Sequence, residues 1–302
     1  WHSPFNRPEQ AEVEGDVMAD GSGRFFGIPD PEPDRLHGMQ TELQADEASA
    51  YGERSRKTVR DCLDRVVAEA RTGDLTEASA RLDHLMSCIQ DLRPADLVPR
   101  RGLAGLFDSR NGRLKRFRTA FREATRSIKD TVAEIEERVS GVETRGASLE
   151  SALAALRDGV REINGHVRVG LAALAPPPEG AEGEEAPVDP YRDLRGRMDD
   201  LDRHRTSGIS ALPCVRAIQN ADAWAADAIR RAAPAISAWQ EDWTQRLGLD
   251  RKRARKVRPD VTELDAARDQ LLAILTRIKA DVAAARDRRQ AQVARLETLR
   301  NA

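Results

Sequence analysis

The sequence has few of the residues that build a thick globular core. Aromatic residues make up 4% of the 302 residues, whereas charged residues make up 33%, and the mean hydropathy is -0.60. This composition suits long charged helices and disfavours a deep apolar interior. The net charge of -2 is close to neutral. Any electrostatic specialisation must therefore come from where the charges lie along the chain.

Cysteines and long apolar runs are also scarce. The three cysteines, Cys62, Cys88 and Cys214, are far apart and form no CxxC pair. This pattern indicates a reducing compartment, in which thiols pack as small apolar groups. There is no run of 18 apolar residues that could span a bilayer, and no signal peptide is apparent. We therefore expect a cytoplasmic protein, or one peripheral to the inner membrane.

Familiar catalytic motifs are missing. The sequence contains no GxGxxG, P-loop, HExxH or GxSxG pattern. His84 and Cys88 have an i, i+4 spacing that two metal ligands could use, but two ligands do not make a site, and ordinary core packing is favoured. We expect no catalytic residue, no metal and no cofactor.

The strongest positive signal is a heptad repeat between residues 114 and 174. Apolar residues recur every seven positions, and a second apolar row follows each of them by three or four residues. At about 1.5 Å per residue, this pattern predicts one helix of roughly 90 Å. The first row comprises Leu114, Phe121, Ile128, Ile135, Val142, Leu149, Leu156 and Ile163.

A second long helix is expected over residues 191–247, where an apolar stripe is interrupted by Pro213 and Pro234. Each of these prolines removes a backbone hydrogen bond and should kink or split the helix. Between the two helices lies an acidic, proline-containing linker, residues 175–189. The simplest cover for the first apolar row is the second helix folded back on it as an antiparallel hairpin, spanning residues 94–260.

The remaining segments complete an all-α fold, an elongated antiparallel coiled-coil bundle built on two very long helices. Residues 1–38 lack periodicity and predict a disordered tail. Residues 39–93 predict two helices, 39–71 and 75–92, paired as a short hairpin. A final helix over 261–300 is expected to pack on the bundle.

The hairpin would gather charge at its two ends. With residue 182 as the tip, residue 112 lies opposite residue 252, and the acidic linker lies at the far end. Bases in the first turn of a helix oppose the helix dipole at a cost of about 0.3–1 kcal/mol each, and such an end suits an anion. An ordinary solvated charged face is the alternative. The candidate anion- or partner-binding residues here are Arg113, Lys115, Arg116, Arg251, Lys252 and Arg253.

Two further groups are candidates for contacts. Leu103, Leu106 and Phe107 lie beside arginines and could insert at the interface of an anionic membrane, or contact a partner. Arg216, Gln219 and Asn220 share one helix face. They could fix the register of the hairpin as a polar layer, or bind an anion or partner.

Several segments resemble the TelA-type toxic anion (tellurite) resistance proteins, over roughly residues 75–300. DLVPRRGLAGLFDSRNGRLKRF, residues 96–117, is similar to the family's junction before a basic helix start. The family pattern P-x-[IV]-R-x-[IV]-Q-N is matched from Pro213 to Asn220, and Ala233–Trp239 and the closing helix are similar to later family segments.

The resemblance implies a role in resistance to tellurite and other stresses, with no established chemistry. We therefore expect a non-catalytic scaffold or adaptor that works through its basic end. Its partners would be other stress-resistance proteins or an anionic membrane surface, and self-association is left open. The alternative is a coiled coil unrelated to anion resistance that binds a polyanion, either nucleic acid or an anionic membrane. The basic run 251–258 has no interleaved aromatic residues for base stacking, which leaves only phosphate contacts.

Overall fold

A computed structural model describes residues 28–45, 48–72, 76–99, 109–174, 192–249 and 258–301. It confirms the all-α fold, and its longest element is helix α4, Arg110–Ala173. All eight residues of the predicted first heptad row are buried on this helix. The 64 residues of α4 give it a length of about 96 Å. A helix of this length needs cover along its whole apolar face.

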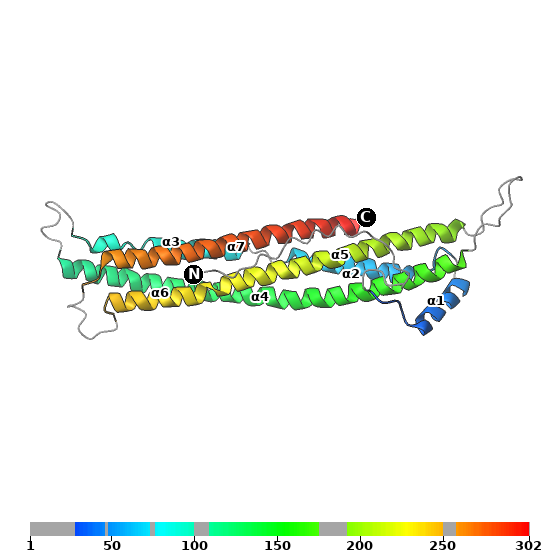
Figure 1. Ribbon diagram of the computed structural model, residues 1–302, viewed down its shortest axis with the longest axis horizontal. Coiled ribbons are helices and arrows are strands. Elements are labelled where there is room, and N and C mark those ends of the chain that lie inside the picture. The colour runs from blue at the N-terminus through cyan, green and yellow to red at the C-terminus, as the bar shows by residue number, and fades with distance from the viewer. Residues whose placement is uncertain are drawn as a thin grey trace, which may run out of the picture.

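The predicted fold-back is confirmed by the packing of α5, Arg192–Arg230, and α6, Ala232–Arg246, against α4. Near the start of α4, the ring of Phe121 lies 5.7 Å from that of Trp239 in α6. Further along α4, the Gln219 side chain of α5 donates to the Gly146 carbonyl. Residues later in α4 thus meet residues earlier in α5 and α6, so the two segments are antiparallel, as Figure 1 shows.

The break between α5 and α6 follows from Pro234. A proline inside a helix cannot donate to the carbonyl four residues earlier and collides with it. That carbonyl belongs to Arg230, where α5 ends, and α6 begins at Ala232. Pro213, in contrast, lies within α5 without splitting it.

Helix α7, Val261–Asn301, runs antiparallel to α5 and α6. Asp260 caps its start by accepting from the Thr262 amide at 2.8 Å. Arg246 of α6 pairs with Glu263 at the beginning of α7, and Asp222 of α5 pairs with Arg289 nearer its end.

The prediction of a hairpin within residues 39–93 is wrong. Helices α2, Glu53–Arg71, and α3, Thr76–Gln90, have no substantial interface with each other and lie end to end along α4. Val59 of α2 packs at Gly159 of α4, whereas Cys88 of α3 lies near Ser127. The apolar face of α4 is long enough to cover both helices, so neither needs the other. A short 3₁₀ helix, η1, Pro94–Leu97, follows α3.

The predicted disordered tail, residues 1–38, is wrong for its last part. Helix α1, Pro33–Ala45, packs against α4, and Ile28 and Met39 are buried beside it. Asp30 accepts from the Asn164 side chain at 2.8 Å. Proline suits the first position of a helix because it has no amide hydrogen to leave unpaired. Residues 1–27 lie outside the described part of the chain.

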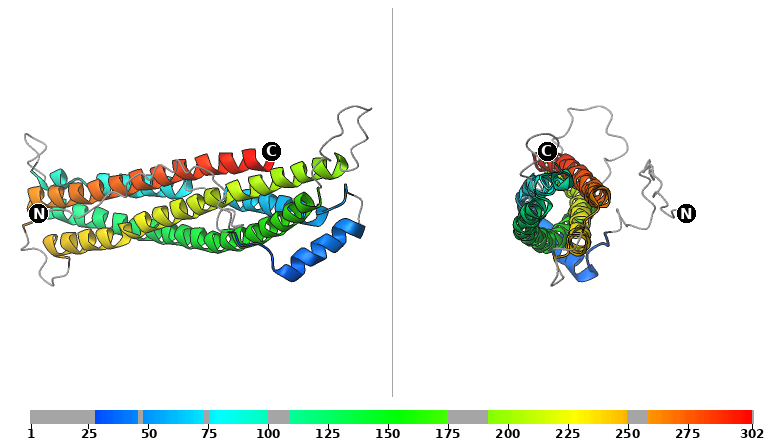
Figure 2. Two further views of the ribbon diagram at one scale, coloured as in Figure 1. Left: turned by 45° about the vertical axis from the view of Figure 1, so that its right-hand side comes forward. Right: turned by 90° about the vertical axis from the view of Figure 1, so that its left-hand side faces the viewer.

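Four antiparallel arms therefore make up the bundle: α2 with α3, then α4, then α5 with α6, then α7. The end-on view in Figure 2 shows the arms arranged around one axis. The buried apolar residues form two separate clusters along this axis. In α4 the first cluster ends at Val142 and the second begins at Leu149, and each of the other arms changes cluster at the same level.

We predict opposite effects for two glycine-to-alanine substitutions in α5. A Cβ at Gly208 would lie 2.6 Å from Val160 Cγ2, because α5 and α4 approach closely there, whereas nothing lies within 4 Å of one at Gly196. Gly208→Ala should lower the free energy of unfolding by about 1–3 kcal/mol. Gly196→Ala should raise it by up to about 1 kcal/mol. Urea unfolding followed by circular dichroism measures both, and equal changes would contradict the close approach.

Candidate functional site

The start of α4 and the end of α6 lie side by side. Ser109 caps α4 by accepting from the Gly112 amide at 3.1 Å. Two turns later, Arg118 Nε donates to the Leu247 carbonyl at 2.8 Å. A cation is favourable at a helix C-terminus, where carbonyls lack partners. We use the name basic end for the region where the start of α4, with its basic sequence 110–118, meets the end of α6. The basic run 251–257, which follows α6 in the sequence, lies outside the described part of the chain.

The predicted binding residues of α4 differ in their surroundings. Arg113 is only 7% exposed, and its Nε donates to the Leu97 carbonyl of η1 at 3.2 Å. Lys115 and Arg116 are exposed. The pKa of Arg118 is lowered, first by burial and then by the nearby charge of Arg122. Arg113 and Arg118 thus help to hold the basic end together, and Lys115 and Arg116 face solvent.

The other predicted residues of this end lie outside the described part of the chain. They are Arg251, Lys252 and Arg253, and the apolar Leu103, Leu106 and Phe107. The described residues that flank them in sequence include Ser109 before α4, Leu249 after α6 and Arg258 before α7. Val98, at the end of η1, is 49% exposed.

An aromatic cluster supports the basic end from inside. Phe117 and Phe121 of α4 pack against Trp239 and Trp243 of α6, with ring centroids 4.9–5.7 Å apart across the cluster. Edge and tilted aromatic contacts of this kind add to ordinary apolar burial. They fix the end of α6 against the start of α4.

Arg216 and Gln219 bridge α5 to α4. The Arg216 guanidinium pairs with Glu150, with Nη2 2.9 Å from Oε1, and Gln219 donates to Glu150 and to the Gly146 carbonyl. The pKa of Glu150 is lowered by the hydrogen bond from Gln219 and then by that from Arg216. Asn220 is exposed. The contacts of Arg216 and Gln219 are those of a polar layer between the helices, and an anion- or partner-binding role for this group stays a prediction.

A buried ion pair at the same level was not predicted from the sequence. Asp222 of α5 and Arg289 of α7 are 4% and 7% exposed in their side chains, and the Arg289 Nε lies 2.9 Å from the Asp222 Oδ1. Arg289 also donates to the Thr72 carbonyl at the end of α2. Burial raises the pKa of Asp222, while Arg289 and then Arg145 oppose the rise.

We call this group the central polar layer. It separates the two apolar clusters and consists of Arg145, Glu150, Arg216, Gln219, Asp222 and Arg289. One signal could have revealed its buried members. Asp222 falls between Ile218 and Ala225, and Arg289 between Ala285 and Leu296, at positions where the heptad pattern calls for apolar residues.

A second polar network ties three arms together near the 174–192 end. Arg197 of α5 donates to the Tyr51 carbonyl at 2.7 Å and to Glu53 Oε2 at 2.8 Å. The hydrogen bond from Arg56 and then that from Arg197 lower the pKa of Glu53 to about 2, against the effect of burial. Burial, and then the charge of Glu42, raise the pKa of the Tyr51 hydroxyl, which donates to the His166 carbonyl.

Comparison with known proteins identifies the family to which the chain belongs. The family model described as "Toxic anion resistance protein (TelA)" matches residues 39–302. The chain belongs to this family. No curated protein and no solved structure matches it. The match covers the sequence of all four arms of the bundle.

The described residues of this TelA family member offer few groups for chemistry. They contain no cluster of three or more potential metal ligands. Burial raises the pKa of both Cys62 and Cys214. Cys88 Sγ lies 3.7 Å from His84 Nε2, and His84 is exposed rather than part of the core. In the described parts of the chain, no helix is both long and apolar enough to cross a membrane.

We predict that removing one charge of the Asp222–Arg289 pair lowers the free energy of unfolding, and that replacing both residues by apolar ones does not. Asp222→Asn leaves Arg289 without its counter-charge and should lower the free energy of unfolding by about 3–5 kcal/mol. The double variant Asp222→Leu with Arg289→Met should be neutral, or more stable by about 1–4 kcal/mol. Chemical denaturation measures both. A double variant less stable than Asp222→Asn would contradict this.

We also predict a pH effect at Glu53. Its pKa falls from 4.5 to about 2 on folding, so its stabilising contribution is complete above pH 4.5 and is lost as the pH falls towards 2. The melting temperature of Glu53→Gln should therefore approach that of the wild type over this interval. Glu123→Gln, which removes an exposed carboxylate of α4, is the matched control. A gap that does not narrow on acidification would contradict the network.

Proposed function

We propose that this protein is a non-catalytic scaffold or adaptor whose basic end contacts an anionic membrane surface. The observation that carries the proposal is the hydrogen bond from Arg118 to the Leu247 carbonyl. It joins the start of α4 to the end of α6, 129 residues apart in the sequence. Each of these two helix ends adjoins a basic stretch of sequence, so we infer that the charge of both stretches is concentrated at one end of the bundle.

The surroundings of this end support an electrostatic contact. Lys115 and Arg116 are exposed, and the aromatic cluster beneath them holds α4 and α6 in place. The adjoining sequence adds Arg251, Lys252 and Arg253, and the apolar Leu103, Leu106 and Phe107. Bases beside a few apolar side chains are typical of segments that bind anionic lipid, at about 1 kcal/mol for each Lys or Arg near the surface.

The opposite charge at the other end favours an oriented contact. The sequence between α4 and α5 carries Glu179, Glu182, Glu184, Glu185 and Asp189. An anionic surface would repel that end and attract the basic end. A long bundle bound in this way would stand away from the surface and present its far end to other proteins, as an adaptor does.

Vesicle co-sedimentation tests the proposal. Wild-type protein should pellet with vesicles containing phosphatidylglycerol and remain in solution with phosphatidylcholine alone. The variant Arg251→Gln, Lys252→Gln, Arg253→Gln should partition about 100-fold more weakly, because it loses roughly 3 kcal/mol of surface attraction. Added salt should weaken wild-type binding.

A matched control variant distinguishes the effect of where the bases lie from the effect of the net charge of the protein. Arg126→Gln, Lys129→Gln, Arg157→Gln removes three exposed bases from the middle of α4 and should bind as the wild type does. Equal loss in both triple variants would mean that overall charge, and not the basic end, governs binding. Steeply salt-dependent binding to duplex DNA, with none to vesicles, would favour the polyanion-binding alternative.

A further inference from the structure

Arg145 is the one guanidinium in the central polar layer that forms no ion pair with the described residues. Its Nε is buried and has no hydrogen-bond partner there. The side chain as a whole is half-buried. A guanidinium has five N–H donors and cannot lose its charge in a protein. The buried Nε of Arg145 is therefore a donor that an acceptor on a bound ligand could satisfy.

The charges around Arg145 do not balance. Asp222 feels the charge of Arg145, but its carboxylate is already paired with Arg289 at 2.9 Å. Glu150 is likewise engaged by Arg216 and Gln219. In the buried part of the layer, two guanidinium groups thus share one carboxylate. Removing a charge from water without compensation is costly, so an anion from solution would be stabilised here.

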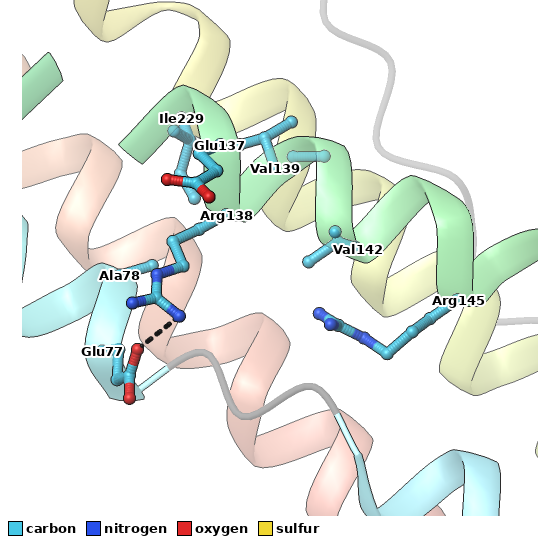
Figure 3. A pocket seen from close by; sticks show the side chains of 10 residues that line it. Glu77, Ala78, Glu137, Arg138, Val139, Val142, Arg145 and Ile229 are labelled. Carbon is cyan, nitrogen blue, oxygen red and sulfur yellow. Dashed lines mark ion pairs between the residues drawn. The ribbon is translucent and has the colours of Figure 1, made fainter. Parts of the chain in front are cut away.

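The space for such an anion lies beside Arg145. A cavity of about 450 Å³ opens between α3, α4 and α5, with apolar walls that include Ala78, Val142 and Ile229. Figure 3 shows Arg145 and Arg138 lining the same cavity. The Arg145 side chain lies next to Gly141, where an added Cβ would be 3.5 Å from Arg145 Nη1.

The other charged groups of the cavity do not satisfy Arg145. Arg138, one heptad before it, pairs with Glu77 of α3 at 2.8 Å, in a contact that is largely exposed. Glu137 lies eight residues before Arg145, about 12 Å along the helix, which is too far for a direct ion pair.

We propose that this cavity binds a small inorganic oxyanion through the guanidinium of Arg145, with Arg138 as a second cationic group. The planar fork of arginine offers two parallel N–H groups, which match two oxygens of a phosphate or sulfate. The cavity is larger than one such ion, so the anion would bind with part of its hydration shell. Binding would join α4 to α3 at the level where the two apolar clusters separate.

Thermal unfolding with added phosphate tests this proposal. Low-millimolar inorganic phosphate should raise the melting temperature of the wild type saturably, because the ligand binds only the folded state. Sodium chloride at the same ionic strength controls for general screening. Arg145→Gln should raise the phosphate concentration needed for half-saturation at least about tenfold, because the variant loses a charge-assisted contact. Sulfate at the same concentration should compete with phosphate in isothermal calorimetry.

The matched control is Arg126→Gln, an exposed arginine on the same helix. It should respond to phosphate as the wild type does. Equal responses in wild type, Arg145→Gln and Arg126→Gln, or an equal response to chloride, would overturn the proposal. If Arg145→Gln does not fold, Arg145→Lys is tested in its place. Lysine keeps the positive charge but cannot make two parallel hydrogen bonds to one anion. Unchanged phosphate binding by Arg145→Lys would overturn the proposed two-bond contact. Vesicle binding should be unaffected by Arg145→Gln, so failure of the phosphate proposal can be distinguished from failure of the membrane proposal.

Discussion

The structure depends on the need to cover one apolar face about 96 Å long. No single compact element can bury a stripe of that length, and the protein has too few aromatic residues to build a thick core beside it. The cover is therefore supplied by arms of comparable length that run antiparallel to α4. Two of these arms are broken helices, α2 with α3 and α5 with α6, because burial requires continuous cover but not a continuous backbone hydrogen-bond ladder.

The apolar interior of the bundle is divided into two clusters by polar residues. The central polar layer lies between two apolar clusters, at the level where α2 gives way to α3. Buried polar groups in long helical assemblies commonly specify register, since a shifted alignment would leave their charges unpaired. The buried pair of Asp222 with Arg289 aligns α5 with α7 in this way, whereas the pair of Glu150 with Arg216 between α4 and α5 is exposed. The same layer holds Arg145, which forms no ion pair with the described residues.

Membership of the toxic anion resistance family and the four-arm fold fit a protein that works by contact. The features that the two proposals use are positions of charge. They are the bases at the start of α4, the Arg145 Nε that has no hydrogen-bond partner among the described residues, and the acidic sequence between α4 and α5. Each would act through an anion, a lipid surface or a partner. Arg145 lies 27 residues after Arg118 on α4, about 40 Å along the helix, so a ligand at the cavity need not obstruct one at the start of α4.

The sequence by itself determined α4, the fold-back of α5 and α6, and α7, because heptad periodicity is local information and a long apolar stripe in water admits few solutions. It did not determine how α2 and α3 pack, since the same amphipathic pattern suits a hairpin or an end-to-end arrangement, and only the length of α4 decided between them. Nor did it show that Arg113 would be buried against Leu97, or that the Arg145 Nε would have no hydrogen-bond partner among the described residues. Those outcomes depend on which groups from distant segments meet across the bundle, and only the tertiary structure brings them together.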